Sequence, residues 1–428
     1  MLRVLVNAYA CSPEMGSEPG MGWNWCVHLA KYCELHIITE GEFRDKIERT
    51  VQTLAQGANM HFYYLPVTEK VRRMCWNQGD WRFYYYYRQW QKRALEKGME
   101  ICASQHIDVI HQLNMIGFRE PGYLWQISRV NDIPFVWGPI GGLKQFPMAY
   151  AKGGSWKMSA FLKLKNFLNI WQLKHNRRVD NAMRQATLLV SSIPESYFAI
   201  KKYKGLESVV IPETGTFSCD ETSIASKRLK TDCLTILWVG KFDFRKRLDL
   251  AIKIMSLAVN ANLNIMLKVF GSGNEKQNKT AESLACQMGI EKHIEWMGNC
   301  PNSQVKEEMR KADLFLFTSV SEDTSTVVLE AISNHLPVLC FDTCGMSAVI
   351  TDNIGYKVPL TTPEQSVKDF AEKIEYLYHH REVLVRMSEN CQKRVEELSW
   401  DNKAKRMYEL YLNENVNVNE NVNSRELV

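Results

Sequence analysis

Several features that define other classes of protein are missing from this sequence. It contains no uncharged apolar run of about 18 residues, the length that a transmembrane helix needs, so we expect no membrane span. Its twelve cysteines form no C-x-x-C pair and no regular spacing, which argues against a disulfide framework or a zinc site. We therefore expect a cytoplasmic protein with reduced thiols. No G-x-G-x-x-G element is present, which disfavours a dinucleotide-dependent oxidoreductase.

Acidic residues are scarce in one half of the chain. Residues 1–215 contain 27 basic and 18 acidic side chains, and the rest of the 428 residues contain 26 basic and 30 acidic ones. The basic half can face anionic phosphates or an anionic membrane surface. Ordinary solvated surface charge explains the same numbers, so the charge asymmetry alone does not distinguish an anion-binding face from an ordinary surface. The length corresponds to two or three domains of ordinary size.

The stretch from Ala312 to Gly345 predicts a strand, a loop, a helix and a second strand. Its apolar runs at 314–317 and 338–341 are typical of parallel strands that are covered on both faces. In an open parallel sheet, ligands bind beyond the carboxyl ends of the strands, beside the N-termini of the following helices. The polar loop at 319–326 lies at such a position.

This loop and the helix after it suit a ligand that carries both phosphate and hydroxyl groups. The amides at Thr324, Ser325 and Thr326 begin the predicted helix, and helix N-termini favour phosphate. Glu322 in the loop and Glu330 in the helix can accept hydrogen bonds from diols. A nucleotide-sugar has this combination of groups.

The E-x7-E spacing of Glu322 and Glu330, followed by LPVLCFDTCG, resembles the donor-site motif of the retaining family-four glycosyltransferases. These are the group 1 glycosyl transferases of bacterial polysaccharide synthesis. The resemblance extends over about residues 1–412. It implies an α/β protein of GT-B fold, in which two doubly wound Rossmann-like domains face each other across a cleft and a C-terminal helix crosses back to the first domain.

Domain boundaries follow from this resemblance and from the composition of the connecting segments. We expect an acceptor-side domain over residues 1–213, an interdomain linker over 214–233, a nucleotide-sugar-binding domain over 234–398, a crossover helix over 399–412 and a disordered tail over 413–428. The tail prediction rests on the low complexity of the sequence NENVNVNENVNSRELV.

Further residues match positions of the family's donor site. Lys241 and Lys246 stand in the places of the Arg and Lys that bind the donor diphosphate, and basic side chains just past a strand can neutralise that group. The resemblance implies that Gly240 and Gly271, at the ends of two predicted strands, frame the nucleotide. Gly20 matches the first glycine of the family's phosphate-proximal loop, in a predicted glycine-rich turn at 16–22.

The resemblance also implies catalytic roles for three residues. Glu322 orients the donor sugar and stabilises positive charge at its ring, Lys246 stabilises the leaving diphosphate, and His111 contacts the sugar or the acceptor. Glu330 holds the ribose diol. His111 ends a predicted strand, and a lone histidine at such a position can equally be structural.

Two stretches combine aromatic with basic residues, at 76–93 and 156–178. Each is consistent with a helix that packs its aromatics inward, or with contact to an anionic membrane surface. Because no nucleic-acid-binding signature accompanies them, we expect no nucleic-acid partner.

The resemblance implies a retaining, metal-independent hexosyltransferase, and the absence of a D-x-D element agrees with metal independence. Its co-substrate is a UDP- or GDP-sugar, with no other cofactor, and its acceptor is a saccharide or a lipid-linked saccharide. We expect a role in cell-surface polysaccharide synthesis at the inner face of the cell membrane. Two alternatives stay open: a nucleotide-sugar 2-epimerase of GT-B fold, and a non-catalytic scaffold that binds a nucleotide-sugar.

Overall fold

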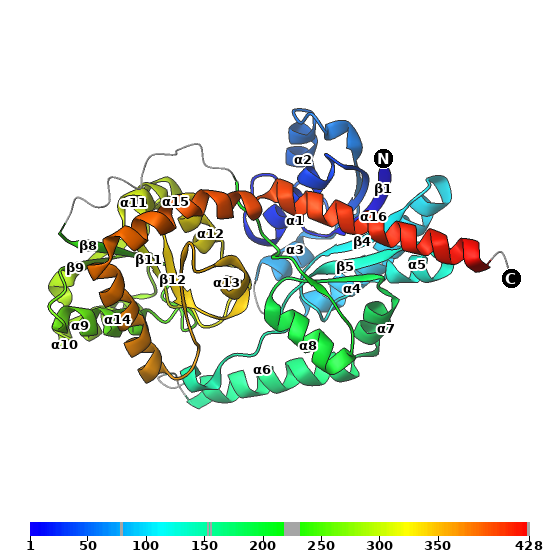
Figure 1. The fold of residues 1–428 in the computed structure, drawn as a ribbon. Coiled ribbons are helices and arrows are strands. Elements are labelled where there is room, and N and C mark those ends of the chain that lie inside the picture. The colour runs from blue at the N-terminus through cyan, green and yellow to red at the C-terminus, as the bar shows by residue number, and fades with distance from the viewer. Residues whose placement is uncertain (78–79, 152–153, 155, 218–231, 426–428) are drawn as a thin grey trace. The chain divides into compact units, whose positions relative to one another are not determined.

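The computed structural model describes residues 1–77, 80–151, 154, 156–217 and 232–425 (Figure 1). The chain divides into two compact units, each built around its own parallel sheet. Unit 1 contains residues 1–143, 169–214 and 400 onward, and unit 2 contains residues 144–168 and 215–399.

The sheet of unit 1 has seven parallel strands in the order β3-β2-β1-β4-β5-β6-β7. Its strands are β1 (Leu2–Ala8), β2 (Cys33–Thr39), β3 (Met60–Tyr64), β4 (Val109–Asn114), β5 (Phe135–Ile140), β6 (Leu188–Ser191) and β7 (Val209–Val210). Its helices are α1 (Ser17–Leu29), α2 (Arg44–Val51), α3 (Glu69–Trp76), α4 (Phe83–Ser104), α5 (Trp125–Asn131), α7 (Arg177–Gln185), α8 (Pro194–Lys204) and α16 (Trp400–Arg425). The helix α6 (Trp156–His175) begins in unit 2 and ends in unit 1.

The sheet of unit 2 has six parallel strands in the order β10-β9-β8-β11-β12-β13. Its strands are β8 (Leu234–Val239), β9 (Ile265–Phe270), β10 (Ile294–Gly298), β11 (Leu314–Phe317), β12 (Val338–Phe341) and β13 (Gly355–Val358). Its helices are α9 (Leu248–Asn260), α10 (Glu275–Gln287), α11 (Asn302–Lys311), α12 (Thr326–Ser333), α13 (Cys344–Val349), α14 (Pro363–His379) and α15 (Arg381–Glu397).

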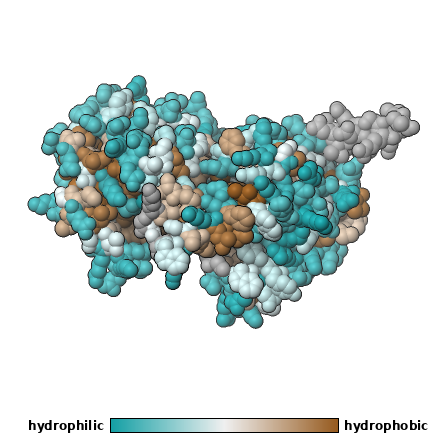
Figure 2. All heavy atoms as spheres, turned by 90° about the horizontal axis from the view of Figure 1, so that it is seen from below, coloured by the Kyte–Doolittle hydropathy of each residue, from teal (hydrophilic) through white to brown (hydrophobic). Residues whose placement is uncertain are grey.

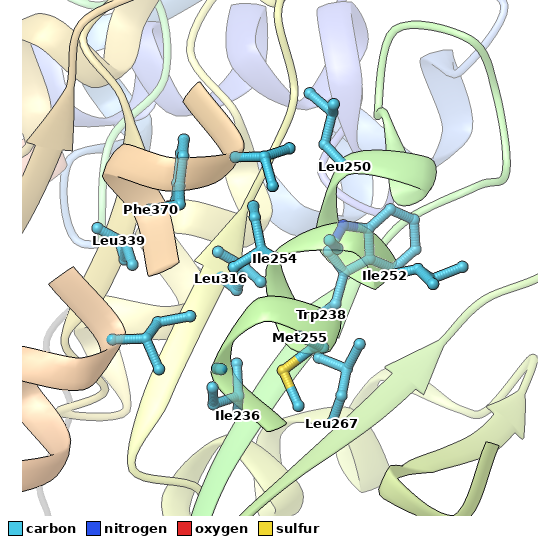
Figure 3. Packing of buried hydrophobic residues seen from close by; sticks show 14 of the residues in the cluster. Ile236, Trp238, Leu250, Ile252, Ile254, Met255, Leu267, Leu316, Leu339 and Phe370 are labelled. Atoms are coloured by element: carbon cyan, nitrogen blue, oxygen red, sulfur yellow. The ribbon is translucent and has the colours of Figure 1, made fainter. Parts of the chain in front are cut away.

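Both sheets are buried on both faces, which explains why their strands are almost continuously apolar. Successive side chains of a strand point to opposite faces, so Leu314 and Leu316 join one core cluster while Phe315 and Phe317 join another. In Figure 3 the side chains of α9 meet those of four neighbouring strands and Phe370 of α14. The doubly wound, two-sheet architecture expected from the sequence is therefore present.

The segment 144–168 belongs to unit 2, although the predicted boundary placed residues 1–213 in one domain. Tyr150 is fully buried in the core of unit 2, and its hydroxyl lies 2.6 Å from Ser366 Oγ. Arg247 donates to the carbonyl of Tyr150 at 2.7 Å, and Phe146 stacks on Phe244. These contacts join residues that are distant in sequence, so no local pattern announces them.

The C-terminal end of the chain also differs from the prediction. The last helix, α16, continues to Arg425, whereas disorder was predicted from residue 413. Adding a residue to an existing helix avoids the cost of nucleation, so a segment rich in Asn and Glu can extend one that has already formed. The residues from 400 belong to unit 1, where Trp400 packs edge-on against Trp25. Most of the predicted linker, residues 218–231, lies outside the described residues.

A third difference concerns the predicted glycine-rich turn at 16–22, because α1 begins at Ser17 and includes two of its glycines. A Cβ at Gly20 would lie 2.0 Å from the carbonyl oxygen of Met15, and one at Gly22 would lie 2.3 Å from that of Ala10. The glycines therefore allow the preceding loop to pack against the helix, and they do not interrupt it.

Candidate functional site

The strand order locates the ligand-binding edge of unit 2. Counted within that unit, the order is 3-2-1-4-5-6, and the direction of winding reverses between β8 and β11. Ligands of doubly wound sheets bind at this switch point, beyond the carboxyl ends of the two strands. We call residues 240–247 and 318–326, the segments that follow β8 and β11, the switch-point site.

Asp243 organises the first segment of the switch-point site. Its Oδ1 accepts hydrogen bonds from the amides of Arg245 (2.8 Å) and Lys246 (3.2 Å), and its Oδ2 accepts one from the Arg245 guanidinium (2.9 Å). Burial opposes ionisation of this carboxyl, but these donors outweigh burial and hold the pKa of Asp243 below its ordinary value. The loop is therefore held in one conformation by its own acidic residue.

The second segment is hydrogen-bonded to the first. The amide of Val320 donates to the carbonyl of Arg245 at 2.9 Å, and Thr318 Oγ1 donates to the carbonyl of Lys246 at 2.8 Å. Trp238 in β8 in turn donates to Thr318 Oγ1 at 3.0 Å. These hydrogen bonds thus hold the two segments together at the end of the sheet.

The hydrogen bonds between the two segments bring together Lys246 and Glu322, two residues that were predicted to be catalytic. Lys246 Nζ lies 3.0 Å from Glu322 Oε1, and the two side chains are 15% and 16% exposed. Ser319 Oγ donates to the same carboxylate oxygen at 3.0 Å, and the Lys246 ammonium lies 5.0 Å from the centre of the Phe317 ring. A cation and an anion therefore meet at the switch point, beyond the carboxyl ends of β8 and β11. Lys241 is exposed at the start of the same loop.

Glycines let the backbone of neighbouring strands pack closely along this edge. Gly271 has φ of +111°, and a Cβ there would lie 2.0 Å from the carbonyl oxygen of Gly240. The Gly271 amide donates to the carbonyl of Gly298 at 2.7 Å. The amide of Gly240 donates to the carbonyl of Phe270 at 3.0 Å, so the ends of β8, β9 and β10 are in backbone contact.

The start of α12 completes the site. Thr324 and Ser325 precede this helix and Thr326 begins it. Glu330, one turn into α12, accepts a hydrogen bond from Asn302 Nδ2 at 3.1 Å. The Asn302 amide therefore orients the carboxylate that was predicted to hold a ribose diol.

Cys344 contacts the second segment of the switch-point site. It has φ of +57°, and its sulfur accepts a hydrogen bond from the amide of Glu322 at 3.4 Å. A glycine would adopt this backbone conformation more readily but has no side chain to accept from that amide. The next residue, Gly345, has no room for a Cβ, which would lie 2.6 Å from Thr324 Oγ1.

Two further basic residues belong to this region, and sequence reasoning gave neither of them a role. Lys144 Nζ lies 2.9 Å from Asp323 Oδ1, next to Glu322. Arg247, with φ of +52°, forms a two-pronged ion pair with Asp249 and anchors the segment 144–168 through Tyr150. Lys144 follows the glycine-rich loop at 138–142, but its sequence position gave no sign that it belongs to unit 2.

In unit 1 the geometry argues against a catalytic role for His111. The side chain is 0% exposed, its Nε2 donates to the carbonyl of Gly138 at 2.7 Å, and its Nδ1 accepts from the Tyr411 hydroxyl at 2.5 Å. Burial lowers the pKa of His111 to about 4, although the Gly138 contact opposes this shift. A neutral imidazole with both nitrogens satisfied by protein groups ties β4 to α16 and offers no atom to a substrate.

Gly20, the other predicted donor contact in unit 1, lies inside α1. Its carbonyl accepts a hydrogen bond from Asn24 Nδ2 at 2.8 Å, within the same helix. Its lack of a side chain is required by the Met15 carbonyl. Packing of α1 against the Met15 carbonyl therefore accounts for a glycine at position 20, and no ligand contact is needed to explain it.

The two aromatic and basic stretches each combine inward and outward side chains. In 76–93, Phe83, Tyr87 and Trp90 are buried, whereas Trp81 and Tyr85 are exposed. In 156–178, most of the large apolar side chains are exposed. Among the helices that the structure describes, none has the length and apolar character needed to cross a bilayer. Within the same residues, no three His, Cys, Asp or Glu side chains are grouped to hold a metal ion.

The architecture defines a fold class. A solved structure of HepE from Anabaena in complex with UDP matches 96% of this chain and 99% of its own chain, with a TM-score of 0.60 and 14% identity. With its two doubly wound parallel sheets, the protein has the GT-B fold.

The sequence comparison identifies the family that the chain resembles. Residues 220–394, which include most of unit 2 and the whole switch-point site, match the family described as "Glycosyl transferases group 1". An uncharacterized glycosyltransferase of Methanocaldococcus jannaschii is 28% identical over 178 residues, which are 41% of this chain and 44% of that protein. The lipopolysaccharide glucosyltransferase WaaG of Escherichia coli is 34% identical over 118 residues, 27% of this chain and 30% of that protein. The chain thus resembles the group 1 glycosyl transferases, and it spans less than half the length of these curated relatives.

Proposed function

We propose that this protein is a retaining glycosyltransferase that moves a hexosyl group from a nucleotide-sugar to a saccharide or lipid-linked acceptor. The observation that carries the proposal is the Lys246–Glu322 pair at the switch point of unit 2, beside the glycine-lined ends of β8 and β9. A phosphate-binding cation, a carboxylate and accessible backbone are the groups that a nucleotide diphosphate sugar requires at such an edge.

Each residue has a defined part in the proposed reaction. As the bond between the anomeric carbon and the diphosphate oxygen breaks, negative charge builds on the leaving diphosphate. The acceptor hydroxyl oxygen bonds to the anomeric carbon from the same face, and its proton passes to the leaving diphosphate. Lys246, Lys241 and the amides at the start of α12 stabilise that charge, and no metal ion is required. Glu322 releases Lys246 to the diphosphate and orients the donor sugar, while Glu330, held by Asn302, accepts hydrogen bonds from the ribose.

The relatives suggest which substrates to examine first. The HepE structure holds UDP, so a UDP-sugar is the first donor to test, with GDP-sugars next. The Escherichia coli relative is named for lipopolysaccharide, which suggests a cell-surface saccharide as the acceptor. We therefore infer a role in polysaccharide synthesis at the inner face of the cell membrane, with peripheral contact to anionic lipid.

Nucleotide binding provides the first test of the proposal. UDP, GDP and their sugars are screened by thermal shift with the wild-type protein and with Glu330→Ala. A ligand at a hundred times its dissociation constant adds about 2.7 kcal/mol of apparent stability. We expect one nucleotide series to stabilise the wild type and to lose most of that effect in Glu330→Ala. Absence of any shift across both series would contradict the proposed donor site.

Product analysis then distinguishes transfer from the alternatives. The stabilising nucleotide-sugar is incubated with and without candidate acceptors, in buffer containing EDTA, and the anomeric configuration of the product is read by NMR. Acceptor-dependent release of nucleoside diphosphate with retained configuration supports the proposal. Release of a sugar epimer without an acceptor indicates a 2-epimerase, and binding without turnover of any acceptor indicates a scaffold.

A further inference from the structure

Three arginines of unit 1 gather at the loop that follows β4. Arg88 in α4 and Arg178 in α7 both donate to the carboxylate of Glu120, at 2.8 Å and 3.1 Å. Arg119 precedes Glu120 in the same loop. Polarity alone does not mark a site, because hydrophilic side chains cover much of the surface that Figure 2 shows, on the side where α6 lies in Figure 1. The informative feature is the ratio of three guanidinium groups to one carboxylate.

This loop, residues 117–122, lies at the ligand-binding edge of unit 1. The winding of the sheet reverses between β1 and β4, and the loop follows the carboxyl end of β4. It is fixed to the segment after β5, because the amide of Phe118 donates to the carbonyl of Gly141 at 3.2 Å. Glu18, an acidic residue at the same edge, accepts a hydrogen bond from the amide of Ile116 at 3.1 Å. The arginines therefore lie beside the switch point of unit 1.

Arg119 differs from the other two arginines in its partners. Its guanidinium donates to Asn169 Oδ1 and Gln172 Oε1 of α6, which are neutral amide oxygens. Its Cζ lies 4.7 Å from the centre of the Phe118 ring. These partners orient the guanidinium, and none of them carries an opposing charge.

The electrostatics of the loop show the same difference. Burial lowers the pKa of Arg119, although charge interactions with Tyr84 and Glu120 oppose this shift. Burial also acts on Arg178, but its hydrogen bonds and charge interactions with Glu120 and Tyr123 outweigh burial and raise its pKa. Because arginine stays protonated in proteins, a bound anion would compensate a charge that the amide partners of Arg119 leave in place.

An aromatic side chain lies next to these arginines. Tyr84 is 46% exposed and stands one turn before Arg88, on the same face of α4. Its ring combines an apolar face with a polar hydroxyl. A saccharide ring, which has apolar faces and a rim of hydroxyl groups, suits such a neighbour.

We propose that Arg119, Arg88 and Tyr84 form a subsite of unit 1 that binds the phosphate group of a phosphorylated acceptor saccharide. The inference rests on the proposed glycosyl transfer and names the chemical class of its acceptor. Three guanidinium groups and the Glu120 carboxylate leave a net charge of +2, which matches a phosphate dianion. A carboxylate ligand would compensate only half of that charge. The phosphate can belong to the saccharide itself or to the diphosphate of a lipid-linked saccharide.

Isothermal titration of the whole chain tests the subsite. Lys246→Met is the common background, which weakens phosphate binding at the switch-point site of unit 2. The ligands are glucose 6-phosphate, inorganic phosphate and, as the uncharged control, glucose. Arg119→Gln, Arg119→Lys and Tyr84→Ala are added to this background. Arg184→Gln is the matched control, because Arg184 is an exposed arginine of unit 1 that pairs with Asp180 at 3.1 Å.

Glucose 6-phosphate should bind in the Lys246→Met background, and glucose should not. Arg119→Gln should weaken binding of both phosphate ligands about tenfold to a hundredfold, because it removes charge-assisted hydrogen bonds. Arg119→Lys should lose less, since it keeps the charge without the forked geometry of the guanidinium. Tyr84→Ala should weaken glucose 6-phosphate about threefold and leave inorganic phosphate unchanged. Arg184→Gln should change neither affinity.

Several outcomes would overturn the proposal. They are absence of glucose 6-phosphate binding, equal affinity for glucose and glucose 6-phosphate, unchanged affinity in Arg119→Gln, and an equal loss in Arg184→Gln. Equal losses in Arg119→Gln and Arg119→Lys would assign Arg119 to holding α6 alone. If circular dichroism shows that Arg119→Gln does not fold, Arg88→Gln takes its place with the same expected loss, since the Arg88 side chain is 45% exposed.

Two further measurements complete the test. Geranyl diphosphate that binds more tightly than glucose 6-phosphate, with the same dependence on Arg119, would support the subsite and assign the phosphate to a lipid-linked acceptor. Weaker binding would assign it to the saccharide itself. Nucleotide-induced thermal shift of the wild type is measured in parallel. Arg119-dependent phosphate binding without a nucleotide shift would refute the proposed glycosyl transfer and leave a phosphate site in unit 1. A nucleotide shift without Arg119-dependent phosphate binding would refute the subsite and leave the donor site standing.

Discussion

Replacing Glu322 with glutamine should tighten the binding of a nucleoside diphosphate, even though the same change removes a residue that the proposed transfer uses. Glu322 holds the Lys246 ammonium at 3.0 Å in the structure without ligand. A diphosphate that uses Lys246 must first displace this carboxylate and then lie beside its negative charge. Glutamine keeps the size of the side chain and removes both obstacles.

The expected magnitude follows from the geometry of the pair. A partly exposed ion pair contributes roughly 1 kcal/mol, so freeing Lys246 should lower the dissociation constant of UDP or GDP about fivefold. Lys246→Met removes a charge-assisted hydrogen bond worth about 1.5–3 kcal/mol and should raise the constant about tenfold to a hundredfold. In the double variant, Glu322→Gln should have little further effect, because no lysine remains to be freed.

Isothermal titration of the diphosphate that stabilises the wild type measures these constants for the three variants. Glu308→Gln is the matched control, since Glu308 pairs with Lys268 at 2.8 Å in the same unit but outside the switch-point site. Weaker diphosphate binding by Glu322→Gln, or the same change in Glu308→Gln, would refute the assignment of Lys246 as the phosphate-binding residue.

Three further predictions follow from other contacts. Glu330→Gln should weaken binding of the nucleoside diphosphate about tenfold, because it removes the charged acceptor for the ribose hydroxyls. Competition assays should show an unchanged affinity for inorganic pyrophosphate, which has no ribose. Equal losses of affinity for both ligands would contradict the ribose role. Folding lowers the pKa of His111 from the ordinary 6.5 to about 4, so the unfolded chain binds more protons than the folded chain between these pH values. The free energy of unfolding should therefore fall by about 3 kcal/mol in total as the pH falls from 6.5 toward 4. Urea unfolding of His111→Gln should show a shallower decline, and identical slopes would exclude His111 as the cause. Arg247→Ala should destabilise unit 2 by about 1–3 kcal/mol, because the hydrogen bond to the Tyr150 carbonyl is lost. Arg247→Gly should destabilise it by less, because glycine adopts the left-handed backbone conformation at this position without strain. Equal denaturation midpoints for the two variants would contradict this prediction.

The sequence alone determined those features that depend on local pattern. Continuous apolar runs such as 314–317 identified buried parallel strands, and the polar segment after each run identified the edge where a ligand binds. Lys246 and Glu322 both follow such strands, and the resemblance to the donor-site motifs of the family predicted that they belong to one site. The structure confirms that they meet, because the carboxyl ends of parallel strands lie on one edge of a sheet.

Tertiary structure decided the features that depend on partners distant in the chain. The neighbours of Lys144 and the core position of Tyr150 come from residues more than 90 positions away, so the predicted domain boundary placed both in the wrong unit. His111 was predicted to end a strand, as a catalytic residue would, but it lies within β4 (Val109–Asn114), and Tyr411 on the last helix covers it. Periodicity predicted α6 but left its environment open. A sequence pattern specifies which side chains share a face, whereas burial depends on which other elements pack against that face.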